Sequence, residues 1–165
     1  MERAIVKGDA KVLAVLNEVL KAELTAINQY FLHAEMCENW GYHRLADETK
    51  KESIGEMKHA EIVMERILLL EGTPNMSAYF KIHIGQNVKQ QFQNDLQLEL
   101  DAVKRLNAGI ATCVAAKDNG SRELLEKILV EEEEHIDHLE AQLHAIEEVG
   151  IENYLAQQLH DGEDN

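Results

Sequence analysis

Two Glu-x-x-His pairs, Glu56 with His59 and Glu132 with His135, are the residues of this sequence best suited to hold a metal ion. Residues three apart on an α-helix project from the same side, so the carboxylate and the imidazole of each pair can reach one ion. Oxygen and imidazole donors together suit divalent transition metals. One such pair alone indicates little, because charge-rich segments usually form solvated helix faces.

The two pairs belong to an internal repeat. Glu23 precedes Glu56 by 33 residues and Glu99 precedes Glu132 by 33 residues, so the two halves of the chain match at an offset of 76. The match continues from Leu20 with Leu96 to Ile27 with Val103. Two helical hairpins of the same design would bring six side chains into one layer of a bundle. These are Glu23, Glu56, His59, Glu99, Glu132 and His135.

Glu23 and Glu99 interrupt apolar stripes that have the spacing of one helix face. The stripe around Glu23 comprises Leu16, Leu20, Ile27 and Tyr30, and the stripe around Glu99 comprises Phe92, Leu96, Val103 and Leu106. Four buried carboxylates carry a charge of about −4, and removing each from water costs several kcal/mol. Two divalent cations would compensate that charge, so the sequence predicts a dinuclear site. The absence of thiolates argues against structural zinc.

Glu132 is the ligand that the pattern identifies least directly, because it lies in the run from Glu131 to Glu134, and such runs are usually solvated. Only Glu132 keeps both its spacing to His135 and the 33-residue repeat, and Glu131 is the alternative. The other histidines have no matched Glu, and most are expected at the surface or as satisfied polar groups. They are His33, His43, His83, His138, His144 and His160.

Four long helices are needed to position these residues, and the apolar periodicity predicts them over 9–40, 43–71, 86–117 and 121–149. Asp9 is a plausible N-cap, and the Gly72–Asn75 cluster and the Asp118–Ser121 turn separate helices. Residues 73–86 lack a helical stripe and can carry the chain along the bundle. A short helix over 151–159 follows. We therefore expect an all-α, antiparallel four-helix bundle with one long crossover, in a single domain over 1–165.

The composition narrows the classes of partner. Sixteen Lys and Arg against 31 Asp and Glu give a formal charge of −15, which disfavours nucleic acid and concentrates small cations near the surface. Cys37 and Cys113 form no CxxC pair and are expected as free thiols. Residues 1–9 contain no apolar segment of a leader, and no stretch is long enough to cross a membrane. We expect a soluble, cytoplasmic protein without a membrane partner.

Beyond this pattern, nearly the whole chain resembles the bacterioferritin family. The residues that carry the resemblance include Lys7-Gly8-Asp9, Glu23, the run Ala26-Ile27-Asn28-Gln29-Tyr30-Phe31-Leu32-His33, Glu52-Ser53-Ile54, Glu56-Met57-Lys58-His59-Ala60, Glu65-Arg66-Ile67-Leu68, Leu70-Glu71-Gly72, Asp95-Leu96, Leu98-Glu99-Leu100, Glu133-Glu134-His135-Ile136-Asp137 and Asn153-Tyr154-Leu155.

The resemblance implies a ferritin-like fold and a ferroxidase centre within each subunit, formed by the same six residues. The chain would be an iron-storage and detoxification protein that oxidises Fe²⁺ with O₂ or H₂O₂. The ferric mineral would be stored inside a hollow homo-oligomeric 24-mer. Tyr30, on the face of Glu23, would lie near the site as a hydrogen-bond donor or electron source, and the alternative is an ordinary aromatic core residue.

Met57 follows a predicted ligand and therefore projects about 100° away from it, off the metal-binding face. From spacing alone a methionine there usually packs in an interface. Its match to the family's haem ligand implies one haem b shared by two subunits across a two-fold axis. A small ferredoxin-type partner would then supply electrons for iron release, and the family resemblance leaves room for co-assembly with a second subunit type.

Three alternatives remain. A rubrerythrin-like di-iron peroxidase has similar ligands, but it would need a rubredoxin-type Cys₄ module that two cysteines cannot form. A DNA-protecting mini-ferritin would build its centre between subunits and lack the doubled ligand set. A non-enzymatic helical interaction module would contain these Glu and His residues by coincidence, and it should gain stability when Glu23 and Glu99 are replaced by Leu.

Overall fold

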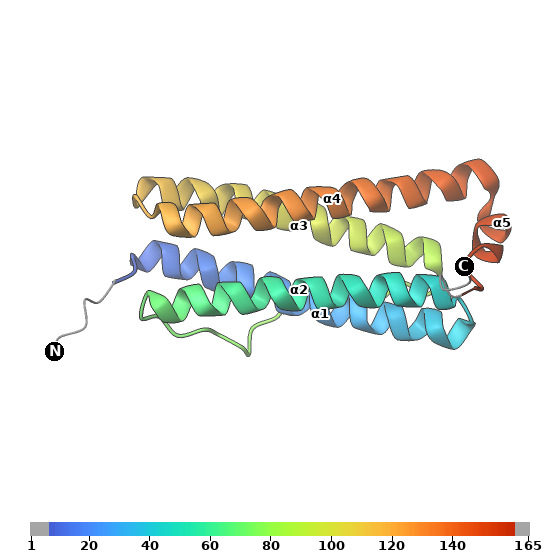
Figure 1. Cartoon of the computed structure of the whole chain (residues 1–165), viewed down its shortest axis with the longest axis horizontal. Coiled ribbons are helices and arrows are strands. Elements are labelled where there is room, and N and C mark those ends of the chain that lie inside the picture. The colour runs from blue at the N-terminus through green and yellow to red at the C-terminus, as the bar shows by residue number, and fades with distance from the viewer. Residues whose placement is uncertain (1–6, 161–165) are drawn as a thin grey trace.

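The computed structural model describes residues 7–160, and the secondary structure in that range is entirely helical. The helices are α1 (Ala10–Trp40), α2 (His43–Leu69), α3 (Val88–Ala115), α4 (Asn119–Val149) and α5 (Ile151–Ala156). Figure 1 shows the hairpin of α1 and α2 lying against the hairpin of α3 and α4, with α5 folded across one end. The expected ferritin-like bundle is confirmed. Residues 1–6 and 161–165 of the expected domain lie outside the described residues.

Capping side chains determine where the long helices begin. Asp9 is the N-cap of α1 as expected, and its carboxylate accepts a hydrogen bond from the Lys11 amide at 2.8 Å. Helix α3 begins two residues later than expected, because the Asn87 side chain caps it by accepting from the Gln90 amide at 2.9 Å. Helix α4 begins two residues earlier than expected, because Asp118 caps it through the Ser121 amide.

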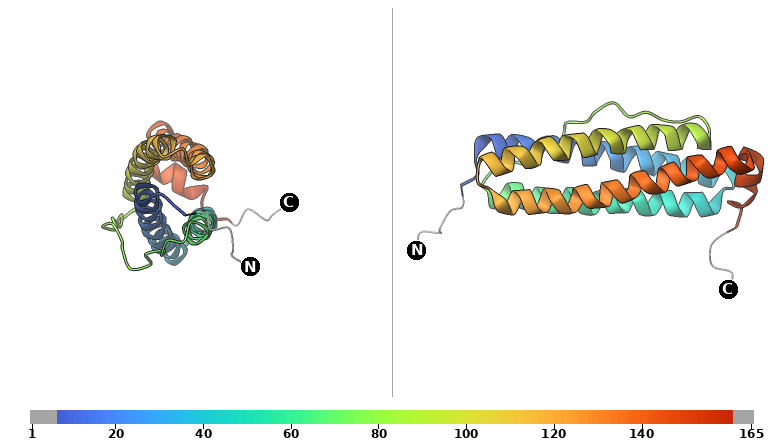
Figure 2. Two further views of the ribbon diagram at one scale, coloured as in Figure 1. Left: turned by 90° about the vertical axis from the view of Figure 1, so that its left-hand side faces the viewer. Right: turned by 90° about the horizontal axis from the view of Figure 1, so that it is seen from above.

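The crossover from α2 to α3 runs as an extended chain along the outside of the bundle (Figure 2). Four polar side chains of α1 hold its backbone. Asn17 bonds the backbones of Thr73 and Asn75, Thr25 accepts from the Phe80 amide, Gln29 accepts from the His83 amide, and His33 accepts from the Gly85 amide at 3.0 Å. The bonds of Thr25, Gln29 and His33 satisfy buried and half-buried backbone groups that no helix or sheet pairs.

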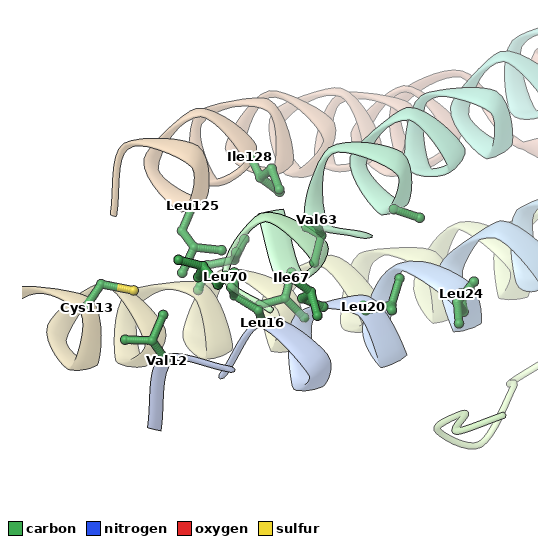
Figure 3. Close-up of a cluster of buried hydrophobic side chains, with 13 residues drawn as sticks. Val12, Leu16, Leu20, Leu24, Val63, Ile67, Leu70, Cys113, Leu125 and Ile128 are labelled. Atoms are coloured by element: carbon green, nitrogen blue, oxygen red, sulfur yellow. The ribbon is translucent and has the colours of Figure 1, made fainter. Parts of the chain in front are cut away.

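Two apolar clusters fill the two ends of the bundle. Figure 3 shows the first, which includes Leu16, Leu20, Ile67, Leu125 and Ile128. The second includes Cys37, Leu45, Phe92, Leu139 and Tyr154, and it joins α5 to the bundle through an edge-to-face contact of the Phe92 and Tyr154 rings. All four long helices contribute buried polar residues to the section between these clusters. The fold therefore reserves the middle of its core for ionisable side chains.

Candidate metal centre

The structure brings all six residues of the predicted dinuclear site together in the middle of the bundle. They form two groups: Glu23, Glu56, His59 and Glu132 make one, and Glu56, Glu99, Glu132 and His135 make the other. In each group, one ligand atom from every residue lies within 4.8 Å of the others. Glu56 and Glu132 belong to both groups, so their carboxylates can bridge two ions. Each position keeps one Glu and one His of its own.

Both histidines direct the Nδ1 atom of the ring into this cluster. His59 Nδ1 lies 3.0 Å from Glu132, 3.3 Å from Glu56 and 3.6 Å from Glu23. His135 Nδ1 lies 3.4 Å from Glu56, 3.7 Å from Glu132 and 3.8 Å from Glu99. An imidazole and several carboxylate oxygens therefore surround each of two neighbouring positions, which is a donor set suited to a divalent cation.

Several donor atoms of the cluster are buried without a hydrogen-bond partner. They are Glu56 Oε1, Glu99 Oε2, Glu132 Oε1 and His135 Nδ1. Native proteins rarely leave buried polar atoms unpaired, because each one costs about 1–3 kcal/mol or more when charged. A bound cation would give each of these atoms a partner. The cluster therefore fits a pair of metal ions better than it fits a closed hydrogen-bond network.

Burial and mutual repulsion shape the proton affinity of these carboxylates. Burial, followed by the charge of Glu56, raises the pKa of Glu23, and the same two causes raise the pKa of Glu99. Burial opposes the shift for Glu132, but its close contacts with Glu99 and the two histidines lower its pKa. Without a cation, the raised pKa values of Glu23 and Glu99 favour protonation of these two carboxyl groups. A metal ion would have to displace those protons.

The pKa values of the two histidines shift in the direction that favours the charged ring. Burial alone would lower the pKa of His59, but Glu132, Glu23 and Glu56 outweigh burial and raise it. The pKa of His135 is raised against burial by Glu132 and Glu52 in the same way. Both imidazoles are therefore strongly stabilised as cations while the centre holds no metal. Metal ligation needs the neutral ring, so ion binding and proton release are linked.

Tyr30 lies beside the second metal position. Its side chain is buried, and its hydroxyl donates a hydrogen bond to Glu99. Burial and the neighbouring charge of Glu99 raise the pKa of this phenol, so it stays protonated and remains a donor. Trp40, by contrast, lies at the end of α1 with its ring edge-on to Tyr42.

A second buried polar group lies next to the centre, and sequence reasoning did not identify it. His33 Nδ1 lies 2.9 Å from Asp95, which also accepts a hydrogen bond from Gln29 at 2.8 Å. His33 is fully buried, its Nε2 atom accepts a hydrogen bond from the Gly85 amide, and its Nδ1 atom faces the Asp95 carboxylate. Its position on the α1 face of Gln29 was visible in the sequence, but its partners on α3 and in the crossover were not.

Glu52 and Glu131 contact the outer sides of the two histidine rings. Glu131 Oε2 lies 2.7 Å from His59 Nε2, and Glu52 Oε2 lies 2.8 Å from His135 Nε2. Glu131, the alternative to Glu132, therefore lies outside the cluster while Glu132 lies within it. A sequence signal for Glu52 did exist, because it extends the stripe of Glu56 and His59 by one turn.

A cavity of about 400 Å³ leads to the cluster from beneath the crossover. Carboxylates of Glu23, Glu56 and Glu132 line it, together with residues of α1, α3 and the crossover. The Phe80 ring also lines this cavity and lies 4.2 Å from Lys21 Nζ and 4.4 Å from Arg105 Cζ. Small molecules therefore have space to approach the buried carboxylates from this side.

Met57 lies on the opposite side of α2 from the neighbouring cluster residues. Its side chain is 55% exposed, whereas Glu56 and His59 are buried. Ile54, one turn earlier on the same face, is also exposed. A thioether on an exposed apolar face is available to a second molecule but cannot reach the cluster.

Comparison with known proteins adds independent findings. A family model for the ferritin-like domain matches residues 13–149. A bacterioferritin of Mycobacterium bovis is 51% identical over 151 residues, which cover 92% of this chain and 95% of that protein. A bacterioferritin of Streptomyces coelicolor is 49% identical over 150 residues, covering 91% and 90%. One of Brucella melitensis is 42% identical over 148 residues, covering 90% and 92%.

Proposed function

The chain belongs to the bacterioferritin family, and from this premise we propose that it stores iron and acts as a ferroxidase, oxidising Fe²⁺ to Fe³⁺ with O₂ or H₂O₂. The observation that carries the proposal is the pair of ligand groups that share Glu56 and Glu132. Two bridged positions allow two Fe²⁺ ions to bind side by side as substrate. Together they can deliver two electrons to one oxidant molecule.

Each residue of the centre has its own role in the proposed reaction. Glu56 and Glu132 bridge the two ions, Glu23 and Glu99 each bind one, and His59 and His135 each supply one nitrogen. The carboxylates stabilise the metal charge as it rises from +2 to +3. The two electrons and two protons convert O₂ to H₂O₂, or H₂O₂ to two water molecules. Tyr30 holds the Glu99 carboxylate in place through its hydroxyl and is a candidate electron source.

Storage of the ferric product requires an enclosed space, which we assign to a 24-mer shell of this chain. Large apolar side chains that remain exposed on the single chain support an assembly. Among them are Phe31, Ile54, Met57 and Leu68. Exposed apolar surface of this kind is typical of an interface between subunits. The formal charge of −15 would draw cations toward such a shell.

The exposed Met57 supports a haem b shared between two copies of the chain, each contributing one thioether. The residues fit this role, because the side chain is accessible and Ile54 provides an apolar neighbour. A bound haem would supply one-electron transfer chemistry. In this proposal, electrons arriving from a ferredoxin-type donor reduce stored iron for release.

Stopped-flow measurement of iron oxidation tests the proposed centre. The shell is loaded anaerobically with Fe²⁺ and mixed with O₂ or with H₂O₂. We expect wild-type protein to show a fast phase that saturates at about two irons per chain. The Glu23→Leu, Glu99→Leu double variant should lack this phase. Light scattering should show that it still assembles.

Glu133→Leu is the matched control, because Glu133 is an exposed member of the same acidic run as Glu132. It should oxidise iron at the wild-type rate. A fast phase that persists in the double variant would exclude this cluster as the ferroxidase centre, whereas a wild-type protein without any fast phase would favour the interaction-module alternative.

A further inference from the structure

The rings of His59 and His135 each have one nitrogen inside the cluster and one outside it. Both rings place Nδ1 inside, among the carboxylates that the two metal positions share. Both rings place Nε2 against a second carboxylate, that of Glu131 for His59 and that of Glu52 for His135. At 2.7 Å and 2.8 Å, these outer contacts are as short as charge-assisted hydrogen bonds.

We propose that Glu131 and Glu52 are positioning residues that orient His59 and His135 so that Nδ1 is the nitrogen offered to metal. The inference rests on the proposed function of the cluster as a metal centre. A neutral imidazole carries its proton on only one nitrogen. A carboxylate that accepts this proton's hydrogen bond at Nε2 leaves the lone pair of Nδ1 directed into the cluster, and it also fixes the ring plane.

The two contacts are reciprocal between helices. Glu52 on α2 serves His135 on α4, and Glu131 on α4 serves His59 on α2. Helices α2 and α4 contact each other far less than the helices of either hairpin do, so these two pairs form a polar link between helices that otherwise have little contact. Each imidazole therefore has the outer partner of its Nε2 atom on the opposite helix.

These outer partners depart from the internal repeat. At the offset of 76, the position that matches Glu52 is Ile128, and the position that matches Glu131 is Gly55. The two carboxylates that contact the histidines from outside the cluster therefore come from positions that the repeat does not relate to each other. The surroundings of the two rings differ as well, because the side chain of His59 is 5% exposed and that of His135 is 20% exposed. The two metal positions therefore have the same types of ligand, but the outer partners and the exposure of their histidines differ.

An ordinary surface ion pair is the alternative explanation, since Glu131 is 58% exposed and exposed pairs contribute little to stability. Three observations favour positioning: the contact is to a buried ring, it occurs at both histidines, and it leaves the same nitrogen facing inward each time. Within the acidic run, Glu131 faces His59 and Glu132 lies in the cluster, whereas Glu133 and Glu134 are exposed.

Titration of the metal-free, full-length shell with Co²⁺ tests the inference without iron oxidation. Isothermal calorimetry measures the affinity of each position, and the visible d–d absorption of Co²⁺ reports ligand geometry. We expect Glu131→Ala and Glu52→Ala each to weaken binding at one position by about 10-fold or more and to change its absorption. Glu131→Gln and Glu52→Gln, which keep an acceptor oxygen, should lose less affinity.

Glu133→Ala is the control, because it removes an exposed carboxylate from the same run and should bind Co²⁺ as wild type does. Circular dichroism and light scattering verify that each variant folds and assembles. If wild type binds two Co²⁺ per chain and both alanine variants match its affinity and spectrum, the inference is wrong while the proposed centre stands. If wild type binds no Co²⁺ at the cluster, both are wrong.

Discussion

Glu23 and Glu99 occupy core positions that leucine would fill in an ordinary bundle. Each is almost fully buried, and the preceding core residues on their stripes, Leu20 and Leu96, are apolar. In the metal-free protein these carboxyl groups oppose folding, because burial raises their pKa and leaves Glu99 Oε2 unpaired. The geometry of the centre is thus held at the expense of stability in the metal-free chain.

Replacing both residues in the Glu23→Leu, Glu99→Leu double variant should therefore stabilise the metal-free protein by about 1–4 kcal/mol. Urea unfolding of the metal-free forms, followed by circular dichroism, measures this difference. Adding Co²⁺ should then raise the unfolding midpoint of wild type but not that of the double variant, because only wild type binds the ion in its folded state.

Glu133→Leu serves again as the control, and it should change the unfolding free energy by no more than about 0.5 kcal/mol, as is usual for exposed sites. A double variant that unfolds at lower urea concentration than wild type would contradict the expectation. It would mean that the carboxylates contribute hydrogen bonds worth more than their burial costs.

At the residue scale, the sequence predicted which side chains converge, but not what surrounds them. The repeated spacing of Glu23, Glu56 and His59 was sufficient for this prediction, because helical periodicity and an internal repeat can both be read from the order of the residues alone. The contact of Glu52 with His135 joins residues 83 positions apart on different helices, and no local pattern specifies it. His33 was identified only as a polar group because its partners lie on other elements.

At the scale of elements, the crossover is the segment that helps to line the cavity beside the centre. Phe80 is held near two cations, Lys21 of α1 and Arg105 of α3, and it lines the cavity that leads to the carboxylates. Each such cation–π contact contributes about 0.5–1 kcal/mol at partly exposed sites. The ring therefore joins α1 and α3 through a segment that has no secondary structure of its own.

Phe80→Leu removes both contacts and should loosen the crossover without melting the helices. Hydrogen exchange read by mass spectrometry should show faster exchange at the amides of Phe80 and His83, which donate to Thr25 and Gln29 of α1. Peptides from α2 and α4 should exchange as in wild type.

Tyr79→Leu is the matched control, because Tyr79 is the exposed neighbour of Phe80 in the same segment. It should leave exchange at these amides unchanged. Equal protection of the crossover in Phe80→Leu and wild type would show that the polar side chains of α1 alone fix its path.

The sequence predicted the helices well because their signals are local. Asp9 and the apolar stripes identified α1, and the two-residue errors at the starts of α3 and α4 arose from the caps Asn87 and Asp118. Helix α5 ends at Ala156, three residues before the expected end. The course of the crossover could not be predicted, since the α1 residues that bind its backbone look like ordinary polar positions until the chain is folded.

At the scale of the whole molecule, the outer face of α2 is left without a partner by a single chain. Its exposed apolar side chains call for an apolar neighbour. No helix among residues 7–160 is long and apolar enough to cross a membrane. Ile54, Met57 and Leu68 are spaced so that they lie along one side of the helix. A second copy of the chain meets this requirement in the proposed shell.

Met57→Leu keeps the apolar character of this face but removes the thioether. Purified shells of the variant should lose the visible absorption of reduced haem b, while iron oxidation at the centre continues at the wild-type rate, because Met57 faces away from the cluster. Absorption spectroscopy and stopped-flow oxidation measure the two outcomes. The control is Met76→Leu, since Met76 is an exposed methionine of the crossover. Equal haem absorption in Met57→Leu and wild type would exclude Met57 as the ligand.

The distribution of ligands along the chain also affects when the centre can exist. Each half contributes one terminal carboxylate, one bridging carboxylate and one imidazole, and the last of them, His135, lies on α4. A ribosome makes α1 and α2 first, so a nascent or truncated polypeptide has only half of a coordination sphere. The proposed iron oxidation would thereby be postponed until translation is nearly complete, and prematurely ended chains would lack the residues to perform it.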